Sequence, residues 1–280
     1  MVNHHVPKSK DEALMLMNQN AYQPIAGGTD YIIQNKQGAG VSVQADKPLL
    51  FIGDLDELKG ITVEKDTITM GAVTPLQTIL DHPLIPEMIQ KIIVKIAGPA
   101  IRHTATLAGN IQNASPAGDS LLFLYLLNAT LVIESFQSTR KVLIEDFITG
   151  PRKTDLMTNE LITKIIIDHP RFSMHSFTKA GGRKADTISK LSFLGAISTE
   201  KKRVMDFRVC FGAVYKTVIR DKTFETSFVN QTIAKIKREK DDILNHYASL
   251  IQPIDDQRST ALYRKKAALR LLSAFLDDIG

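Results

Sequence analysis

The sequence of 280 residues predicts an α+β protein, and three stretches support this fold class. Residues 66–72 alternate between polar and apolar side chains, which is the pattern of a half-buried strand. Residues 121–127 form a nearly continuous apolar run, which suits a buried helix that begins near Asp119. In the last third of the chain, strands are followed by helices, and this order predicts an antiparallel sheet with helices on one face.

The elements of the first part are predicted from caps, breaks and apolar runs. Ser9 precedes a short apolar helix over residues 13–17, and Thr74-Pro75 fits the start of another helix. The other elements predicted here are strands over 49–52, 130–133 and 161–167, helices over 76–80 and 88–96, and a short segment at 144–147.

Asp168-His169-Pro170 breaks the last of these strands, and we expect a domain boundary there. Beyond it, the sequence predicts strands over 172–179, 188–199 and 207–215 and helices near 227–250 and 259–276. The last helix carries an apolar stripe that we expect in the core or at a subunit contact, formed by Leu262, Leu269, Leu272 and Leu276.

The composition is that of a soluble globular protein, with 44% hydrophobic and 23% charged residues. No apolar run approaches the span of a bilayer, and the N-terminal stretch lacks the features of a signal peptide, so we expect a cytoplasmic protein without membrane contact. The net charge is +5, but the cations are scattered and the sequence has no Trp, so we expect no nucleic-acid binding.

Other site chemistries find little support in the residues. Cys210 is the only cysteine, which excludes an internal disulfide and a thiolate-bound iron–sulfur cluster. None of the seven histidines lies in an HExxH pattern, so we expect no metal site. Ser115 lacks the G-x-S-x-G context of a hydrolase nucleophile, and the Gly-rich stretches match neither a P-loop nor a G-x-G-x-x-G motif.

Two stretches rich in small residues indicate a ligand. In residues 101–120, Gly109 allows a close backbone approach, and a series of polar side chains supplies hydrogen-bonding groups, namely Thr106, Asn110, Asn113, Ser115 and Asp119. Residues 24–33 place Gly27, Gly28 and Thr29 between apolar residues, and a Gly-rich turn can bind an anion through its N–H groups. Either stretch alone could be only a tight turn; together they predict a dinucleotide pyrophosphate held between them.

The motifs AGGTD at 26–30 and TLAGNIQNASPAGDS at 106–120 resemble the FAD-binding subunit of the molybdenum hydroxylases. That family includes the flavin domain of xanthine dehydrogenase and the medium subunit of aerobic carbon monoxide dehydrogenase. The resemblance covers nearly the whole chain in the family's order, with further blocks at 150–154, 160–162, 179–183, 186–188, 211–214 and 258–264.

The resemblance implies a two-part FAD-binding domain of the vanillyl-alcohol-oxidase/PCMH type over residues 1–170. Its two α/β subdomains would span roughly residues 1–55 and 56–170. A smaller α+β flavoprotein domain, with an antiparallel sheet plus helices, would then occupy residues 171–280.

It also implies the site residues. The pyrophosphate loops fall on Ala26, Gly27, Gly28, Thr29 and Asp30 and on Thr106, Gly109 and Asn110. Asn113 and Asp119 would contact the ribityl, ribose or adjacent phosphate region, although Asp119 could equally cap the helix that follows it. Ile162 would pack near the flavin ring, and Lys179 would lie near the polar edge of the ring unless it is a surface lysine.

The chain departs from the family at Ala108, where the family usually has glycine. If that position required a positive φ, alanine would cost about 1 kcal/mol. If glycine serves only close approach, one methyl group could be tolerated. We expect FAD still to bind, with reduced affinity at most.

The implied role is an electron relay within a hetero-oligomer. Substrate would be hydroxylated at a molybdenum cofactor on a large subunit, and electrons would pass through iron–sulfur clusters of a small subunit to FAD and on to NAD+ or another acceptor. The chain is not expected to hydroxylate substrate alone, and no residue of it is assigned a catalytic role. Two alternatives remain open: a self-contained FAD oxidoreductase of the same binding fold, and a non-catalytic scaffold that has lost FAD, which only Ala108 favours.

Overall fold

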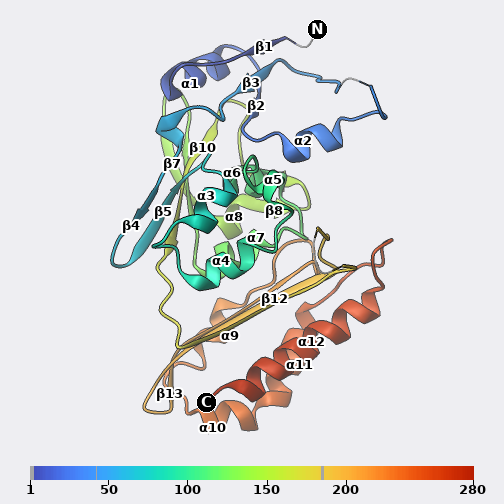
Figure 1. Ribbon diagram of the computed structural model, residues 1–280. Helices are drawn as coiled ribbons and strands as arrows, with labels where there is room; N and C mark the ends of the chain where they lie inside the picture. The colour runs from blue at the N-terminus through green and yellow to red at the C-terminus, as the bar shows by residue number, and fades with distance from the viewer. Residues whose placement is uncertain (1–2, 42, 184–185) are drawn as a thin grey trace. The chain divides into compact units, whose positions relative to one another are not determined.

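The computed structural model describes residues 3–41, 43–183 and 186–280, and the chain divides into two compact units. Figure 1 shows the elements in order along the chain. Unit 1 comprises Met1–Ile85, Ala97–Ala114 and Asn128–His169, and unit 2 comprises Pro86–Ile96, Ser115–Leu127 and Pro170–Gly280. Two segments from the first half of the chain therefore belong to the same unit as the C-terminal residues.

Unit 1 begins with a small parallel sheet in the order β1 (His4–His5), β3 (Leu49–Phe51), β2 (Gln23–Ile25). Helix α1 (Lys10–Gln19) precedes β2, and the side chain of Ser9 caps it by accepting a hydrogen bond from the Glu12 N–H. The helix buries Ala13, Leu14 and Met17 in a core cluster that includes Leu50 of β3. The predicted cap and helix are confirmed.

The larger sheet of unit 1 has five antiparallel strands. Their order is β4 (Ile61–Val63), β5 (Thr67–Gly71), β10 (Leu161–Asp168), β6 (Thr130–Glu134) and β7 (Thr139–Leu143). The three strands predicted at 66–72, 130–133 and 161–167 therefore lie side by side as β5, β6 and β10.

The remaining elements of unit 1 are short. They are α2 (Thr29–Gln34), the 3₁₀ turn η1 (Asp56–Leu58), α3 (Leu76–Asp81), α5 (Pro99–Arg102), α6 (Leu107–Asn113), α8 (Ile144–Phe147), β8 (Ile148–Gly150) and β9 (Lys153–Thr154).

Unit 2 is built on the antiparallel sheet β11 (Met174–Ala180), β12 (Leu191–Glu200), β13 (Arg203–Gly212). One face carries Phe193 and Phe207, which pack in a core cluster with Phe275 of α12 (Ala261–Asp278) and with α11 (Lys240–Leu250). The other helices of unit 2 are α4 (Glu87–Ile93), α7 (Ser120–Leu126), α9 (Lys222–Thr226) and α10 (Ile233–Arg238).

The sheet of unit 2 is covered on both faces, so the prediction of helices on one face only is wrong. Leu194 and Cys210, which alternate with the residues of the core cluster, are fully buried, and α7 contacts β12 and β13. Figure 1 shows α7 and α12 on either side of β12. Sequence reasoning missed this cover because α7 precedes the strands of the sheet by about fifty to eighty residues. All seven residues of the helix are buried.

Two helix predictions need correction in detail. The helix predicted over 227–250 is divided at Glu239 into α10 and α11. In α12, Leu272 and Leu276 are buried as predicted, but Leu262 is 64% exposed because the buried side of the helix follows Arg264, Ala268 and Phe275 instead. Among the described residues, no helix combines the length and apolarity needed to cross a bilayer.

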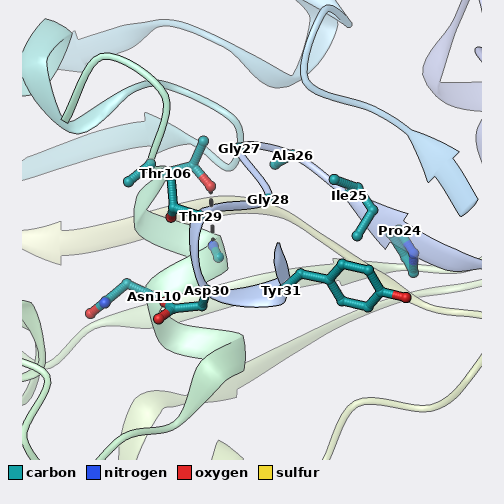
Figure 2. Close-up of a pocket in the computed structure, with 12 residues that line it drawn as sticks. Pro24, Ile25, Ala26, Gly27, Gly28, Thr29, Asp30, Tyr31, Thr106 and Asn110 are labelled. Atoms are coloured by element: carbon teal, nitrogen blue, oxygen red, sulfur yellow. Dashed lines mark hydrogen bonds between the residues drawn. The ribbon is translucent and has the colours of Figure 1, made fainter. Parts of the chain in front are cut away.

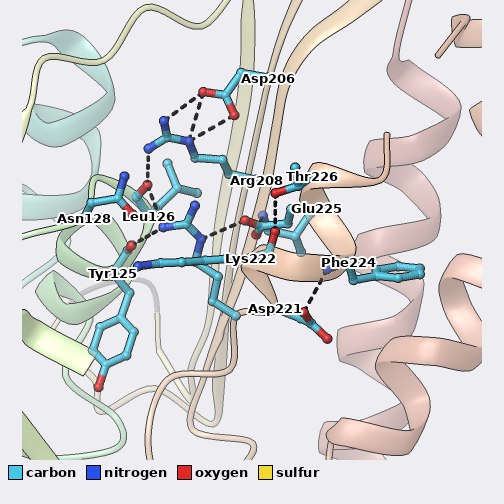
Figure 3. A network of polar contacts seen from close by, with 12 residues as sticks. Tyr125, Leu126, Asn128, Asp206, Arg208, Asp221, Lys222, Phe224, Glu225 and Thr226 are labelled. Atoms are coloured by element: carbon cyan, nitrogen blue, oxygen red, sulfur yellow. Dashed lines mark hydrogen bonds and ion pairs between the residues drawn. The ribbon is translucent and has the colours of Figure 1, made fainter. Parts of the chain in front are cut away.

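Two arginines hold the C-terminal end of α7 (Figure 3). Arg220 donates to the carbonyls of Tyr125 and Leu126 at 2.5 and 3.1 Å, and Arg208 donates to the Leu126 carbonyl at 2.8 Å. The last carbonyls of a helix lack the N–H partner four residues further on, so the guanidinium groups bind to them and complement the helix dipole. Arg220 also donates to Glu225 at 2.9 Å, and both side chains of this ion pair are buried.

Burial raises the pKa of Glu225 to about 7, although Arg220 and the Val209 N–H oppose this shift. Because the folded-state pKa lies above the unfolded one, protonation favours folding, and the contribution is lost as the pH rises through 7. We expect the free energy of unfolding to fall between pH 5 and pH 8 by about 2–3 kcal/mol more in the wild type than in Glu225→Gln.

Urea unfolding of both proteins at the two pH values measures this difference. Glu200→Gln is the control, because Glu200 is an exposed acid at the end of β12. Equal pH dependence in the wild type and in Glu225→Gln would contradict the prediction.

Candidate functional site

The two predicted small-residue turns line one cavity of unit 1 (Figure 2). Its volume is about 110 Å³. The lining residues come from residues 24–31 and from the stretch before and within α6, namely Ala105, Thr106, Gly109 and Asn110. Eight predicted site residues therefore meet in one place: Ala26, Gly27, Gly28, Thr29, Asp30, Thr106, Gly109 and Asn110.

Gly27 allows the two turns to touch through their backbones. A Cβ atom at this position would lie 2.0 Å from the carbonyl oxygen of Thr104 and 3.1 Å from Cα of Ala105. Gly53 approaches the first turn in the same way, because its Cβ would lie 2.9 Å from the carbonyl oxygen of Ala26. Three chain segments thus stack with no room for a side chain between them, and only glycine fits.

The first turn leads from β2 into α2. Gly28 adopts a φ of +67° as the N-cap of α2, a conformation that other residues rarely adopt. The first N–H groups of a helix have no carbonyl partner within the helix. The turn therefore brings Thr29 and Asp30, at the start of α2, to the lining of the cavity.

The second turn is fixed by Thr106, whose side-chain oxygen accepts a hydrogen bond from the Gly109 N–H at 3.2 Å and caps α6. The Leu76 N–H donates to the Ala105 carbonyl at 2.9 Å, which ties the turn to α3. A Cβ at Gly109 would lie 3.0 Å from the Thr106 hydroxyl oxygen. A side chain at this position would thus be in tight contact with Thr106, and Gly109 does not have a positive φ.

Ala108 lies in the first turn of α6 and is not among the described residues with positive φ. The backbone strain considered for this departure from the family is therefore absent, and alanine is a strong helix former.

The charge around the cavity is low. Among the described residues that line it, Asp30 is the only charged one. The surrounding protein raises the pKa of the Asp30 carboxyl by desolvation, and Arg152 opposes this shift. Arg152 lies in the turn between β8 and β9, and its N–H donates to the carbonyl of Ala114 at the end of α6. An anion in the cavity would therefore be bound mainly by N–H and hydroxyl donors.

Two further predicted residues of unit 1 lie outside the lining. Asn113 ends α6, and its side-chain oxygen accepts a hydrogen bond from Gln34 of α2 at 2.8 Å. The elements that carry the two turns are thus joined a second time. Ile162 is buried in β10 next to a register irregularity between Ile162 and Lys164.

The last two predicted residues, Asp119 and Lys179, belong to unit 2 and form an ion pair. Asp119 Oδ2 lies 2.7 Å from Lys179 Nζ, and the side chains are 5% and 9% exposed. Asp119 makes no side-chain cap on α7, so the capping role considered for it is not found. Ser189 donates to Asp119 Oδ1 at 2.5 Å, and Lys179 also donates to the Lys95 carbonyl at 2.7 Å.

Sequence reasoning missed Ser189 and Lys95 at this cluster. Neither lies in a motif, and a backbone carbonyl such as that of Lys95 leaves no trace in the sequence. Lys179 and Lys95 also line a second cavity of about 600 Å³, together with Phe177, Arg183 and other residues of unit 2.

The chain is thus an α+β protein in which two small-residue turns, distant in sequence, line one cavity. Two family models match the chain: the FAD binding domain in molybdopterin dehydrogenase over residues 1–170, and the CO dehydrogenase flavoprotein C-terminal domain over residues 176–279. The chain belongs to this family of molybdenum hydroxylase flavoproteins, a family of oxidoreductase subunits, and its cofactor is FAD.

The chain is similar to several characterised proteins. It is 35% identical to the nicotinate dehydrogenase FAD-subunit of Eubacterium barkeri over 65% of this chain and 64% of that one. It is 28% identical to the glyceraldehyde dehydrogenase medium chain of Sulfolobus acidocaldarius over 92% and 91% of the two chains. A chain of the reconstituted CO dehydrogenase from Oligotropha carboxidovorans superposes with a TM-score of 0.86 at 21% identity, covering 98% and 96%, and this likeness shows the fold.

We predict that Gly27→Ala weakens FAD binding by at least about tenfold, because its Cβ would force the two turns apart. Titration of the apoprotein with FAD, followed by flavin fluorescence, measures the dissociation constant. Gly38→Ala is the matched control, since a Cβ there meets only Val41 at 3.5 Å. Wild-type affinity in Gly27→Ala would show that the turn contact does not form the site.

Proposed function

We propose that this chain is the FAD-carrying electron-transfer subunit of a multi-subunit molybdenum hydroxylase. Bound FAD would supply the redox chemistry that links iron–sulfur clusters of a partner subunit to NAD+ or another acceptor. The observation that carries the proposal is the cavity that two turns, distant in sequence, line together.

The cavity suits the diphosphate of FAD better than its rings. A volume of about 110 Å³ is well below the range of about 300–1,000 Å³ that is typical of pockets for whole drug-sized ligands. The donors that we propose are the amides at the start of α2 and the hydroxyls of Thr29 and Thr106. Successive N–H groups in such turns form a concavity for anions. The lining lacks a Lys or Arg among the described residues, so we propose that preorganised hydrogen bonds provide the affinity.

The other assignments rest on the resemblance. We propose that Asn113 and Asp119 contact the ribityl, ribose or adjacent phosphate region and that Ile162 packs near the flavin ring. Lys179 would lie near the polar edge of that ring, where a cation favours the anionic reduced flavin and raises its potential. We also keep the division of the sequence into a FAD-binding domain over 1–170 and a C-terminal domain over 171–280 as part of the proposal.

The partner subunits are inferred from what this chain lacks and from its relatives. Cys210 is the only cysteine of the sequence, it is fully buried, and burial raises the pKa of its thiol well above the ordinary value. A buried neutral thiol cannot serve as a cluster ligand. Relatives are described as FAD-subunits or medium chains of dehydrogenases. We therefore propose an iron–sulfur small subunit and a molybdenum-cofactor large subunit as partners.

We predict that the chain, purified alone and supplied with FAD, shows bound-flavin absorption bands and is bleached by a chemical reductant, but oxidises neither purines nor aldehydes. Addition of the partner subunits should restore turnover. Flavin bands are expected because the cavity and the family both indicate FAD.

The alternatives give different results in the same experiment. Substrate oxidation by the isolated chain would indicate a self-contained oxidoreductase. Failure to bind added FAD would indicate a scaffold that has lost the cofactor.

A further inference from the structure

The Asp119 carboxylate of unit 2 is held on both sides. Ser189 Oγ donates to Oδ1 at 2.5 Å, and Lys179 Nζ lies 2.7 Å from Oδ2. Asp119 is 6% exposed and Ser189 is fully buried. A buried carboxylate depends strongly on such partners, because water does not replace a lost one. Each oxygen retains a second lone pair, so the pairing leaves room for a ligand hydroxyl.

Two of the three N–H donors of the Lys179 ammonium have partners in the protein. One of these donors faces Asp119, and a second faces the Lys95 carbonyl at 2.7 Å. Lys179 also lines the cavity of about 600 Å³ in unit 2, whose wall includes the ring of Phe177. The third donor is therefore available to an acceptor atom of a ligand in this cavity.

The cluster is assembled from separate segments of unit 2. Asp119 precedes α7, Lys179 lies on β11, and Ser189 lies two residues before β12. The Ser189 hydroxyl fixes which way the Asp119 carboxylate faces, and the carboxylate in turn fixes the ammonium.

We infer that Ser189 and Asp119 are positioning residues, which hold the Lys179 ammonium so that one N–H is presented to an acceptor atom of the flavin. The inference rests on the proposed function only for the identity of the ligand. Positioning of Lys179 by Ser189 is a property of the chain itself and can be tested without FAD.

Ser192 provides a matched control. It is fully buried like Ser189, and it lies directly opposite Lys179 in the register of β11 and β12. Its hydroxyl has no hydrogen-bond partner within the described part of the chain. Ser192→Ala therefore removes the same group next to the same lysine without removing a bond to Asp119.

The test is competitive acetylation of amines in the apoprotein, quantified by peptide mass spectrometry. The acetylation rate at Lys179 is divided by the rate at Lys240, which forms an ion pair with Asp277 in unit 2. A substitution that destabilises unit 2 as a whole would raise both rates and leave the ratio unchanged. We expect Ser189→Ala to raise this ratio about tenfold, since it removes a hydrogen bond to a charged group, and Ser192→Ala to leave it unchanged.

Asp119→Asn keeps the side-chain volume but removes the charge that pairs with Lys179, so it should raise the same ratio. This variant replaces Ser189→Ala in the test if Ser189→Ala does not fold. In the FAD-loaded wild type, Lys179 should be acetylated more slowly than in the apoprotein. The flavin midpoint potential should be lower in Ser189→Ala than in Ser192→Ala, because the cation is no longer held in place.

An unchanged ratio in Ser189→Ala, or an equal rise in Ser192→Ala, would overturn the positioning role. A wild type that binds FAD without protecting Lys179 would overturn the contact with the cofactor. A wild type that binds no FAD would overturn the proposed function, while the acetylation ratios of the apoprotein would still decide the role of Ser189.

Discussion

The direct backbone contact between the two turns is the constraint on which the candidate site depends. Gly27 lies so close to the carbonyl of Thr104 that a side chain at position 27 cannot be accommodated. The contact brings the start of α2 to the start of α6, although about eighty residues separate them in sequence. Gly53 extends the same arrangement by approaching Ala26. The arrangement of the turns around the cavity therefore depends on the absence of side chains at Gly27 and Gly53.

A second constraint governs unit 2. The helix α7 is buried on all sides, and its last carbonyls are bound by Arg208 and Arg220. This arrangement holds the helix on the sheet and thereby places Asp119, which precedes the helix, against Lys179 and Ser189. Glu225 contributes by binding Arg220 and the Val209 N–H. Packing of the helix and geometry of the polar cluster are thus coupled within one unit.

Local signals predicted much of the fold. The alternation at 66–72 and the apolar run at 161–167 correctly predicted β5 and β10, because both strands have a buried face. The cap at Ser9 gave α1 because its hydrogen bond is formed between residues three apart. The cover of the C-terminal sheet by α7 was not predictable in this way, since no local pattern records which distant sheet a buried helix packs against.

The candidate site was likewise predictable only where local sequence determines it. Small residues marked both turns, and the two stretches together predicted one ligand between them; both turns line one cavity. The pairing of Asp119 with Lys179, and the contribution of Ser189, depend on three segments meeting, and a single serine before a strand carries no signal. The sequence left open whether position 108 requires a positive φ, because a glycine in a motif can serve either conformation or close approach; the structure shows that the position is helical.

Hydrogen–deuterium exchange of the whole chain, with and without FAD, tests the central claim most directly. If both turns bind one diphosphate, the amides of residues 26–31 and 105–110 should become protected together, at the same FAD concentration, and ADP should protect the same two segments. Protection of only one segment, or of neither while FAD remains bound, would contradict the account.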